Sequence, residues 1–556
     1  MFTRRRLLGT AVAATATKWL VPQALAEALA PAPKLTAQDS PWDVRRFGAV
    51  GDGKTMDTHA VQAAIDACHQ AGGGRVHFAT GCTFLVGTIY LKDHIKLYVD
   101  TNATIVGSNN LGDYGSDVGL NPFFPETIDP CLIYAKGVVD IGLGGDGTII
   151  GYTASGFSAP AEADARARKQ RPMLIRLESC SQITITDITL RHCGSWCLHL
   201  KRSNDITLHN VRIHNEKQDG FDLESCQNVT ISDCHLLECG DDAIAITTSA
   251  RDQPSKNITI TNCLMHSRWS AIRFGPLSKG DFEEITVSNC VFFDCNGGGL
   301  KLGTFEGGAI RNCLFDNIVM DQVIAPIGLY VATWPEIGST APNPPMMPPG
   351  KISGLQFRGI RVIAKPQPPN AHPDGNDGLF FHGHPQGLIE NILLRDVSIT
   401  LSGGGTAEQA ARREIVDMDQ IDYRKDGYWT DHKTTWGVPV AYGLYARHIQ
   451  GLTLEDVRFE LREPDARPVV FVSDCAQTRI QSFTASSSPE QSALIVARNC
   501  DGLQLSEVTP TPKAVVLLRL EGAKSAGIVL SGNDPRGFDK ASVCLDGATE
   551  AAVLSR

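Results

Sequence analysis

Three aspartates, Asp219, Asp241 and Asp242, stand in two short glycine-marked segments, Lys217–Asp222 and Gly240–Ile246. Carboxyl groups that share a site repel one another, so at least one of them should keep its proton above the usual pKa of about 4. A protonated and an ionised carboxyl at one site supply the acid and the base that hydrolysis of a glycosidic bond requires. The fold of the intervening chain therefore decides whether these residues can do chemistry together.

The chain around them repeats a short strand pattern. Alternating apolar and polar segments recur with their first threonine at positions 184, 207, 230, 259 and 286. Such segments, rich in β-branched residues and closed by Asn, Asp or Gly, are typical of strands with one buried face. Their interval predicts an all-β fold, a right-handed parallel β-helix. The leucine signature of the competing solenoid is absent, and weaker copies at 389–392, 452–454 and 503–505 extend the repeat.

The repeat sets the register of the next strand in each coil. Inward anchors recur at Leu198, Phe221, Ile244, Ile272 and Leu300. Because side chains alternate along a strand, the following residues must point outward. They are His199, Asp222, Ala245, Arg273 and Lys301, with Tyr330 as the expected sixth. Two residues before the anchors lie Trp196, Asp219, Asp242, Ser270 and Gly298. Asp219 and Asp242 should thus lie about 5 Å apart on adjacent coils, with Asp241 beside them.

Other acids and the cysteines have plainer interpretations. Asp187 and Asp233 end repeat strands, where we expect them to cap turns. Four of the 16 cysteines, Cys234, Cys263, Cys290 and Cys313, follow turn residues and should form an interior column. A disulfide set or a metal cluster is the functional alternative, and small buried filler is the favoured one. There is no Cys-x-x-Cys pair, and we predict no metal site or cofactor.

The N-terminal residues predict export. Thr3–Leu8 contains three consecutive arginines, and an alanine-rich stretch with two Ala-x-Ala sites follows. Residues 1–30 resemble a twin-arginine signal peptide, which implies the twin-arginine export machinery as a partner and a periplasmic or secreted protein. A short membrane anchor is the alternative, which Lys18 and Pro22 disfavour because a span needs about 20 apolar residues. The mature form should have no membrane partner.

Residues 31–556 are expected to form a single β-helix domain. Val61, Ala64, Ile65 and Cys68 fall on one helical face, with Thr58 as N-cap, and predict a helix that covers the open first coil. Two insertions are expected as irregular loops: 335–373, with ten prolines, and 402–436, which carries Tyr423, Tyr428, Trp429 and Trp436. Such loops favour a groove closed at one end. The pair His382 and His384 is interpreted as loop.

Charge and composition exclude several classes. The chain has 51 Lys+Arg against 61 Asp+Glu, a formal net charge of −10, which argues against a nucleic-acid or anionic-membrane partner. Hydrophobic residues make up 42% of the 556 residues, too many for a disordered chain.

The two aspartate motifs resemble glycoside hydrolase family 28, the polygalacturonases and rhamnogalacturonan hydrolases. Lys217–Asp222 is similar to the Asn-Thr-Asp-Gly motif and Gly240–Ile246 to the Gly-Asp-Asp motif, and the resemblance covers at least residues 42–334. It implies Asp241 as general acid, with Asp219 and Asp242 sharing the base role. It also implies an inverting reaction, for which acid and base are expected about 6.5–9.5 Å apart.

The chain departs from the family pattern at two places. The family's His-Gly motif falls at Trp269-Ser270, and its Arg-Ile-Lys motif at Lys301-Leu302-Gly303. We expect Arg273 and Lys301 to contact a substrate carboxylate, Trp269 to stack on a sugar, and His199 to tune Asp219 or bind a hydroxyl.

The sequence therefore predicts an exported glycoside hydrolase of pectic or related uronic-acid-containing glycans. Two alternatives stay open. A calcium-dependent polysaccharide lyase would use the aspartates as ligands and Arg273 or Lys301 as base. A non-catalytic β-helix would only bind glycan.

Overall fold

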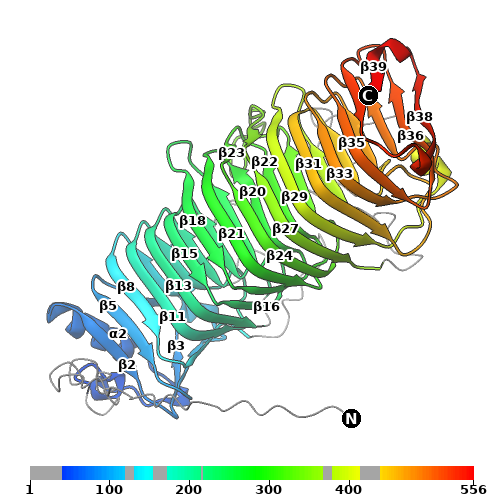
Figure 1. Ribbon diagram of the computed structural model, residues 1–556. Helices are drawn as coiled ribbons and strands as arrows, with labels where there is room; N and C mark the ends of the chain where they lie inside the picture. Colours follow the sequence, from blue (N-terminus) through cyan, green and yellow to red (C-terminus); the bar gives the residue numbers. More distant parts are fainter. Residues whose placement is uncertain are drawn as a thin grey trace, which may run out of the picture.

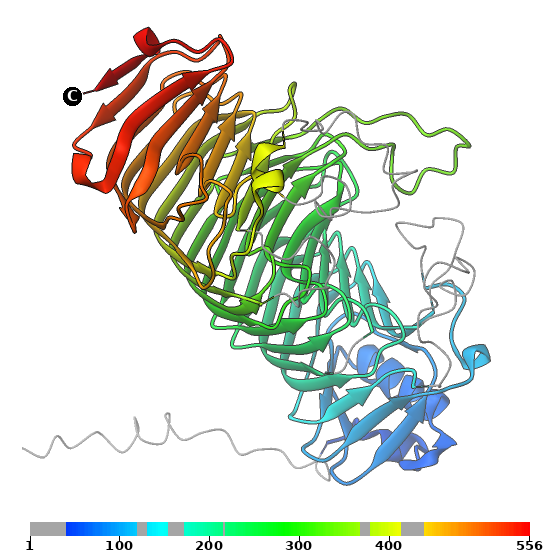
Figure 2. The same cartoon turned by 90° about the vertical axis from the view of Figure 1, so that its right-hand side faces the viewer.

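The computed structural model describes residues 40–118, 130–153, 172–214, 217–366, 378–412 and 439–555. Parallel strands stack coil upon coil along one axis, from the N-terminal end to the C-terminal end (Figures 1 and 2). The chain is a right-handed parallel β-helix, as the repeat predicted. Residues 1–30, with the predicted signal peptide, lie outside the described residues.

Two sheets of parallel strands make the walls of the solenoid. The 15 strands of sheet B, among the described residues, are β4 Ile89–Tyr90, β7 Cys131–Lys136, β10 Met173–Glu178, β12 Leu198–Lys201, β14 Phe221–Glu224, β17 Ile244–Thr248, β20 Ser270–Ser278, β22 Gly298–Thr304, β25 Ile327–Val331, β28 Leu379–His382, β30 Leu444–Arg447, β32 Val470–Ser473, β34 Ile495–Arg498, β36 Ala514–Glu521 and β38 Phe538–Leu545.

Sheet A follows sheet B in each coil and is bent. Its 24 strands in the described ranges are β1 Asp52–Met56, β2 Gly74–Phe78, β3 Thr83–Val86, β5 Ile95–Val99, β6 Thr104–Gly107, β8 Val139–Gly144, β9 Thr148–Ile150, β11 Ser181–Arg191, β13 Asn204–His214, β15 Gln227–Ser232, β16 His235–Cys239, β18 Ser255–Thr261, β19 Leu264–Ser267, β21 Phe282–Phe293, β23 Ala309–Arg311, β24 Leu314–Val323, β26 Lys351–Ser353, β27 Gln356–Ala364, β29 Ile389–Leu401, β31 Ile449–Leu461, β33 Arg479–Ser486, β35 Gln504–Thr511, β37 Ile528–Ser531 and β39 Val553–Ser555.

The bend in sheet A explains the turn residues of the repeat. Asp187, Asn210, Asp233, Asn262 and Asn289 sit at one corner of successive coils, each with φ between 50° and 56°. Left-handed backbone favours Asn and Asp among residues with a side chain. Their side chains also bond along the stack: the Asn210 amide donates to the Asp187 carboxylate over 2.8 Å. Asp187 and Asp233 are therefore turn residues, as predicted.

The predicted register is confirmed over the coils that carry the three aspartates. Leu198, Phe221, Ile244, Ile272 and Leu300 are directly paired along sheet B, and all five are fully buried. The threonine ladder from 184 to 286 is likewise in register on sheet A. Inward rows of this kind build one apolar core that runs the length of the solenoid.

Two residues were assigned to the wrong rows. The position that pairs with Lys301 is Gly328, and Tyr330 lies two residues further along β25. Cys313 does not continue the cysteine column, because Cys290 pairs with Ile318. Cys234, Cys263 and Cys290 do occupy equivalent positions, and each carries a free, buried thiol, as expected for filler.

The predicted N-terminal helix is present, but its first residue is assigned differently. Helix α2, Thr58–Gln70, buries Val61, Ala64, Ile65 and Cys68 as predicted, but its N-cap is Asp57 rather than Thr58. The Thr58 hydroxyl instead accepts from the Gly87 N–H over 2.8 Å. The other described helices are α4 Ala407–Ala411, η2 Val44–Phe47, η3 Leu111–Asp113, η5 Pro535–Gly537 and η6 Glu550–Ala552. Among the described residues, no helix has the length and apolar character to cross a membrane.

The prediction of an irregular loop over 335–373 is wrong in its second half. Strands β26 and β27 pair with neighbouring coils on both sides. The ten prolines cluster at 335–349 and 366–373, so they leave 351–364 free to pair. In the second insertion, the four aromatic residues from Tyr423 to Trp436 lie outside the described residues.

Candidate active site

The structure brings the three aspartates together on one edge of sheet B. One carboxylate oxygen from each of Asp219, Asp241 and Asp242 lies within 4.8 Å of the other two. Asp219 precedes β14 and Asp242 precedes β17, and the Gly220 N–H donates to the Asp242 carbonyl over 3.0 Å. Coil stacking therefore makes the cluster, because the two residues are 23 positions apart in sequence. We call these three residues the aspartate cluster.

Backbone N–H groups hold two members of the aspartate cluster in place. The Asp219 carboxylate accepts from the Asp242 N–H over 3.2 Å, and the Asp242 carboxylate accepts from the Ser270 N–H over 3.0 Å. Each carboxylate is thus fixed through one oxygen by the coil that follows it. Both side chains are buried, and Asp241 is partly exposed. The second oxygens of Asp219 and Asp242 are the groups that can face a substrate.

Burial and mutual repulsion raise the proton affinity of the cluster. The pKa of Asp241 is raised to about 6, mainly by burial and then by the charge of Asp242, while Arg273 and Lys301 oppose the rise. The pKa of Asp219 is raised well above its usual range by burial and by the charges of Asp241 and Asp242. At least one carboxyl of the cluster therefore keeps its proton above the usual range, as the sequence predicted.

Two cations border the cluster in the outward row. The Arg273 guanidinium lies 3.5 Å from the second oxygen of Asp242, and both groups are buried. The Lys301 ammonium lies 4.8 Å from the centre of the Trp269 ring, a cation–π contact. The indole that replaces the family's usual histidine thus lies beside the lysine that replaces its arginine. Arg273 and Lys301 form the positive side of the site, with the Trp269 ring beside Lys301.

His199 and Asp222 belong to a second buried network. The Nε2 atom of His199 lies 3.1 Å from Glu224, whose other oxygen lies 3.0 Å from the Lys201 ammonium. Burial lowers the pKa of His199 to about 4, so the neutral ring donates to Glu224. The Thr247 hydroxyl lies 3.5 Å from Asp222, whose pKa burial raises well above its usual range. Within the part of the chain that the structure describes, His199 bonds to Glu224 and not to Asp219.

Glu224 and Lys201 were not predicted from the sequence, although a signal existed. They occupy the next outward positions of β14 and β12, two residues beyond Asp222 and His199. Although burial opposes it, the hydrogen bond from His199 and the charge of Lys201 keep the pKa of Glu224 below its usual range. An ionised carboxylate is therefore held in the wall next to the aspartate cluster.

The outward row of sheet B that contains Lys301 becomes apolar on its C-terminal side, through Phe380, Tyr445 and Phe471. Here the Phe305 and Trp334 rings lie 4.5 Å apart, and Phe380 stacks on Tyr445 at 4.9 Å. Tyr330 belongs to this apolar cluster, and its hydroxyl lies 2.4 Å from where a Cβ of Gly328 would be. The full cluster is Leu277, Phe305, Tyr330, Ala332, Trp334, Ile337, Phe380, Val440, Ala441, Tyr445, Phe471, Ala493, Val496 and Val516. All of its members are buried, so the face is covered on this side.

The spacing of acid and base differs from the expectation. The nearest carboxylate oxygens lie within 4.8 Å of one another, well short of about 6.5–9.5 Å. The cluster is this tight because Asp219 and Asp242 occupy equivalent positions of adjacent coils, about 4.8 Å apart, and Asp241 is the sequence neighbour of Asp242. Three close carboxylates can also hold a cation, but Ca²⁺ takes 6–8 oxygen ligands and the cluster offers three residues.

Comparison with known proteins agrees with this geometry. The model of glycosyl hydrolases family 28 matches residues 80–343, a range that includes the aspartate cluster and both cations. The chain is similar to glycosyl hydrolases family 28 over these residues. A probable polygalacturonase of Vitis vinifera is 26% identical to this chain over 295 residues, 49% of this chain and 59% of that protein.

Two further relatives match a larger share of the chain. The exo-poly-alpha-D-galacturonosidase of Dickeya chrysanthemi is 22% identical over 418 residues, 64% of this chain and 68% of that protein. The solved structure of the Yersinia enterocolitica family 28 exopolygalacturonase has a TM-score of 0.57 at 18% identity, over 79% of this chain and 77% of that one. The chain spans 59% of the length of each of the two first plant relatives.

Proposed function

We propose that this protein is a member of glycosyl hydrolases family 28 and hydrolyses O-glycosidic bonds in pectic or related uronic-acid-containing glycans. What supports the proposal most is the aspartate cluster itself: three carboxyls on adjacent coils, two of them fixed by backbone N–H groups. Relatives named as polygalacturonases support the substrate class. Arg273 and Lys301, beside the cluster, are the groups suited to a uronate carboxylate.

The proposed reaction gives each aspartate a separate task. Asp241, partly exposed and with its pKa raised to about 6, donates its proton to the leaving glycosidic oxygen. Asp242 takes a proton from water while the water oxygen bonds to the anomeric carbon, and the charge of Asp242 is compensated by Arg273 at 3.5 Å. Asp219 holds that water from the adjacent coil. The products are two saturated sugars, one with a new reducing end.

We propose that the reaction inverts the anomeric centre. Asp219 and Asp242, the two carboxyls assigned to the water, project from adjacent coils, so we place the water between them. The water then does not have to fit between the general acid and the base. A nucleophilic carboxylate would instead need one uncompensated oxygen aimed at the anomeric carbon, whereas Asp242 faces Arg273. The anomer of the first product, followed by proton NMR, tests this step.

We further propose that cleavage proceeds from chain ends. The apolar cluster, with its Trp334 and Phe305 rings, covers the outward row of sheet B beyond Lys301. A glycan held against Lys301 and Trp269 would therefore end there. The twin-arginine signal predicted for residues 1–30 supports export to the periplasm or medium as part of the same proposal.

Oligogalacturonate digestion, with matched variants, tests the function. The wild type should release saturated products, Asp241→Asn should lose most turnover, and Asp233→Asn should behave as the wild type because Asn already occupies equivalent ladder positions. An unsaturated, ultraviolet-absorbing product that disappears on chelation would replace the proposal with a lyase. Binding without any turnover, unchanged in Asp241→Asn, would leave a glycan-binding β-helix.

A further inference from the structure

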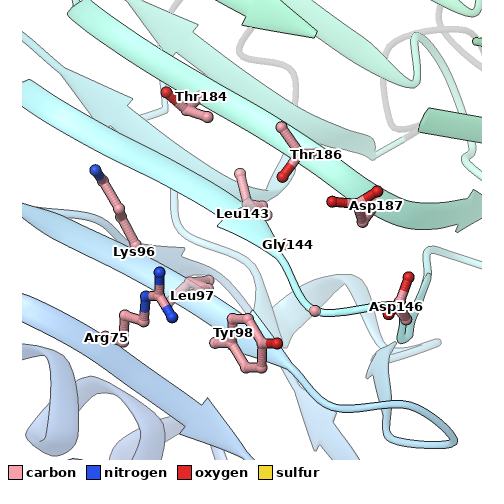
Figure 3. Close-up of a pocket in the computed structure, with 11 residues that line it drawn as sticks. Arg75, Lys96, Leu97, Tyr98, Leu143, Gly144, Asp146, Thr184, Thr186 and Asp187 are labelled. Carbon is pink, nitrogen blue, oxygen red and sulfur yellow. The ribbon is translucent and has the colours of Figure 1, made fainter. Parts of the chain in front are cut away.

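A second hollow lies on sheet A, away from the aspartate cluster. Strands β2, β5, β8 and β11 run side by side there, and their outward residues form two rows. In one row Arg75 and Lys96 are followed by Gly142 and then Thr184. In the other row Tyr98 is followed by Gly144. The result is a pocket of about 340 Å³, shown in Figure 3.

The pocket exists because β8 has no side chain at either outward position. A Cβ at Gly142 would lie 2.3 Å from the Thr184 carbonyl oxygen, and one at Gly144 would lie 3.0 Å from that of Thr186. Neither position therefore takes a larger residue without a backbone shift. The gap between β5 and β11 is two strand spacings, roughly 10 Å, which is wide enough for a sugar ring to lie between the flanking side chains.

The basic and acidic residues that line the pocket lie at opposite ends of it. Figure 3 places Arg75 and Lys96 at one end, the Tyr98 ring in the middle, and Asp146 and Asp187 at the other end. The Arg75 guanidinium lies 5.4 Å from the Tyr98 ring centre and is exposed, and no ion pair of the described residues engages it. Lys96 is paired with Asp140 over 3.0 Å. Arg75 is therefore the cation available to an acidic ligand.

The middle and far end of the pocket offer hydroxyl partners. The hydroxyl groups of Tyr98, Thr184 and Thr186 line the pocket and form no hydrogen bond with other residues that the structure describes. The His77 ring packs against Tyr98 at 5.2 Å and fixes its plane. A positioned aromatic face, a free guanidinium and several hydroxyl and carboxylate groups match a sugar acid, which presents a ring face, a carboxylate and hydroxyls.

We propose that this pocket is a second glycan-binding site, specific for uronate units and separate from the aspartate cluster. The uronate carboxylate binds Arg75, the sugar ring stacks on Tyr98, and its hydroxyls reach Thr184, Thr186 and the two acids. Because the pocket lies on sheet A and the aspartate cluster on the edge of sheet B, one chain can hold polymer at both places. The choice of uronate rests on the proposed function, whereas the existence of the site does not.

Calorimetric titration of the Asp241→Asn protein with a galacturonate hexamer tests the proposal without turnover. Two sites per chain are expected. Adding Arg75→Ala should weaken one of them about tenfold, the loss of one charge-assisted hydrogen bond. Adding Tyr98→Ala should remove that site, while Tyr98→Phe should keep it because the ring remains. Arg458→Ala, which removes another exposed arginine of sheet A, should change neither site.

Each outcome decides the matter. A single site that Arg75→Ala and Tyr98→Ala leave unchanged, in variants that keep the wild-type melting temperature, would overturn the proposal. Equal binding of a neutral glucan hexamer at the second site would overturn its specificity for uronates. If the wild type fails to hydrolyse oligogalacturonates but the Arg75-dependent site is present, the proposed function falls and the second site stands.

Discussion

Replacing Asp241 by Asn should stabilise the protein in a way that grows with pH. The folded state raises the pKa of Asp241 from 3.8 to about 6, chiefly by burial and then by the charge of Asp242. Between these two values the unfolded chain releases a proton that the folded chain keeps, so this carboxyl makes the wild type less stable as pH rises. Two pKa units correspond to about 3 kcal/mol, which the variant avoids above pH 7.

Denaturant unfolding of the wild type and Asp241→Asn at pH 4, 5, 6 and 7 measures this effect. The difference in unfolding free energy should be near zero at pH 4 and approach about 3 kcal/mol at pH 7. Asp233→Asn, on the exposed corner ladder, should show no such trend. A difference for Asp241→Asn that stays flat with pH, or that reverses sign, would refute the claim that the cluster is held together against charge repulsion.

Three further outcomes follow from the same site. Activity should decline as pH rises through about 6, because the donor Asp241 must be protonated; a pH–rate profile with no alkaline limb near that value would contradict the role of Asp241. Arg273→Gln should raise KM for galacturonate oligomers more than for reduced, uncharged oligomers, and equal effects on both would separate Arg273 from carboxylate binding. Trp334→Ala should destabilise the chain by about 3–5 kcal/mol and add internal cleavage products; a product pattern still confined to chain ends would show that the apolar cluster does not close the groove.

Much of the site could be predicted because a stacked coil converts a sequence interval into a spatial neighbour. The steps between inward anchors carried Asp219 and Asp242 to equivalent positions, and Asp241 followed from its place beside Asp242. Tyr330 was assigned to the correct, outward face of its strand but to the wrong row. A shift of two residues along a strand leaves a side chain on the same face and changes only the row. The face of the sheet to which a side chain points is therefore easier to predict than the row in which it lies.

The error at Cys313 has a different cause. Two corners of each coil use a left-handed residue: Asn289 occupies one of them and Asn312 the other, both with φ 55°. A turn residue followed by cysteine looks the same at either corner, and the sequence pattern does not separate them. Only the pairing of Cys290 with Ile318 in the structure shows that Cys313 lies outside the cysteine column.

Contacts between distant segments were beyond the sequence pattern. Trp334 and Val440 both belong to the apolar cluster, although they lie more than 100 residues apart in the sequence. The repeat pattern contains no signal for this contact. The bond from His199 to Glu224, rather than to Asp219, depends on side-chain direction within the outward rows. Such contacts form between side chains on the outward face of the sheet, and the spacing of the coils in the sequence does not determine them.

Digestion of an oligogalacturonate in oxygen-18 water tests the central claim most directly, because the proposed cluster activates water for attack on the anomeric carbon. One labelled oxygen should enter each new reducing end, and label should be lost together with turnover in Asp241→Asn. Products that carry no label and an unsaturated end would contradict hydrolysis by the aspartate cluster.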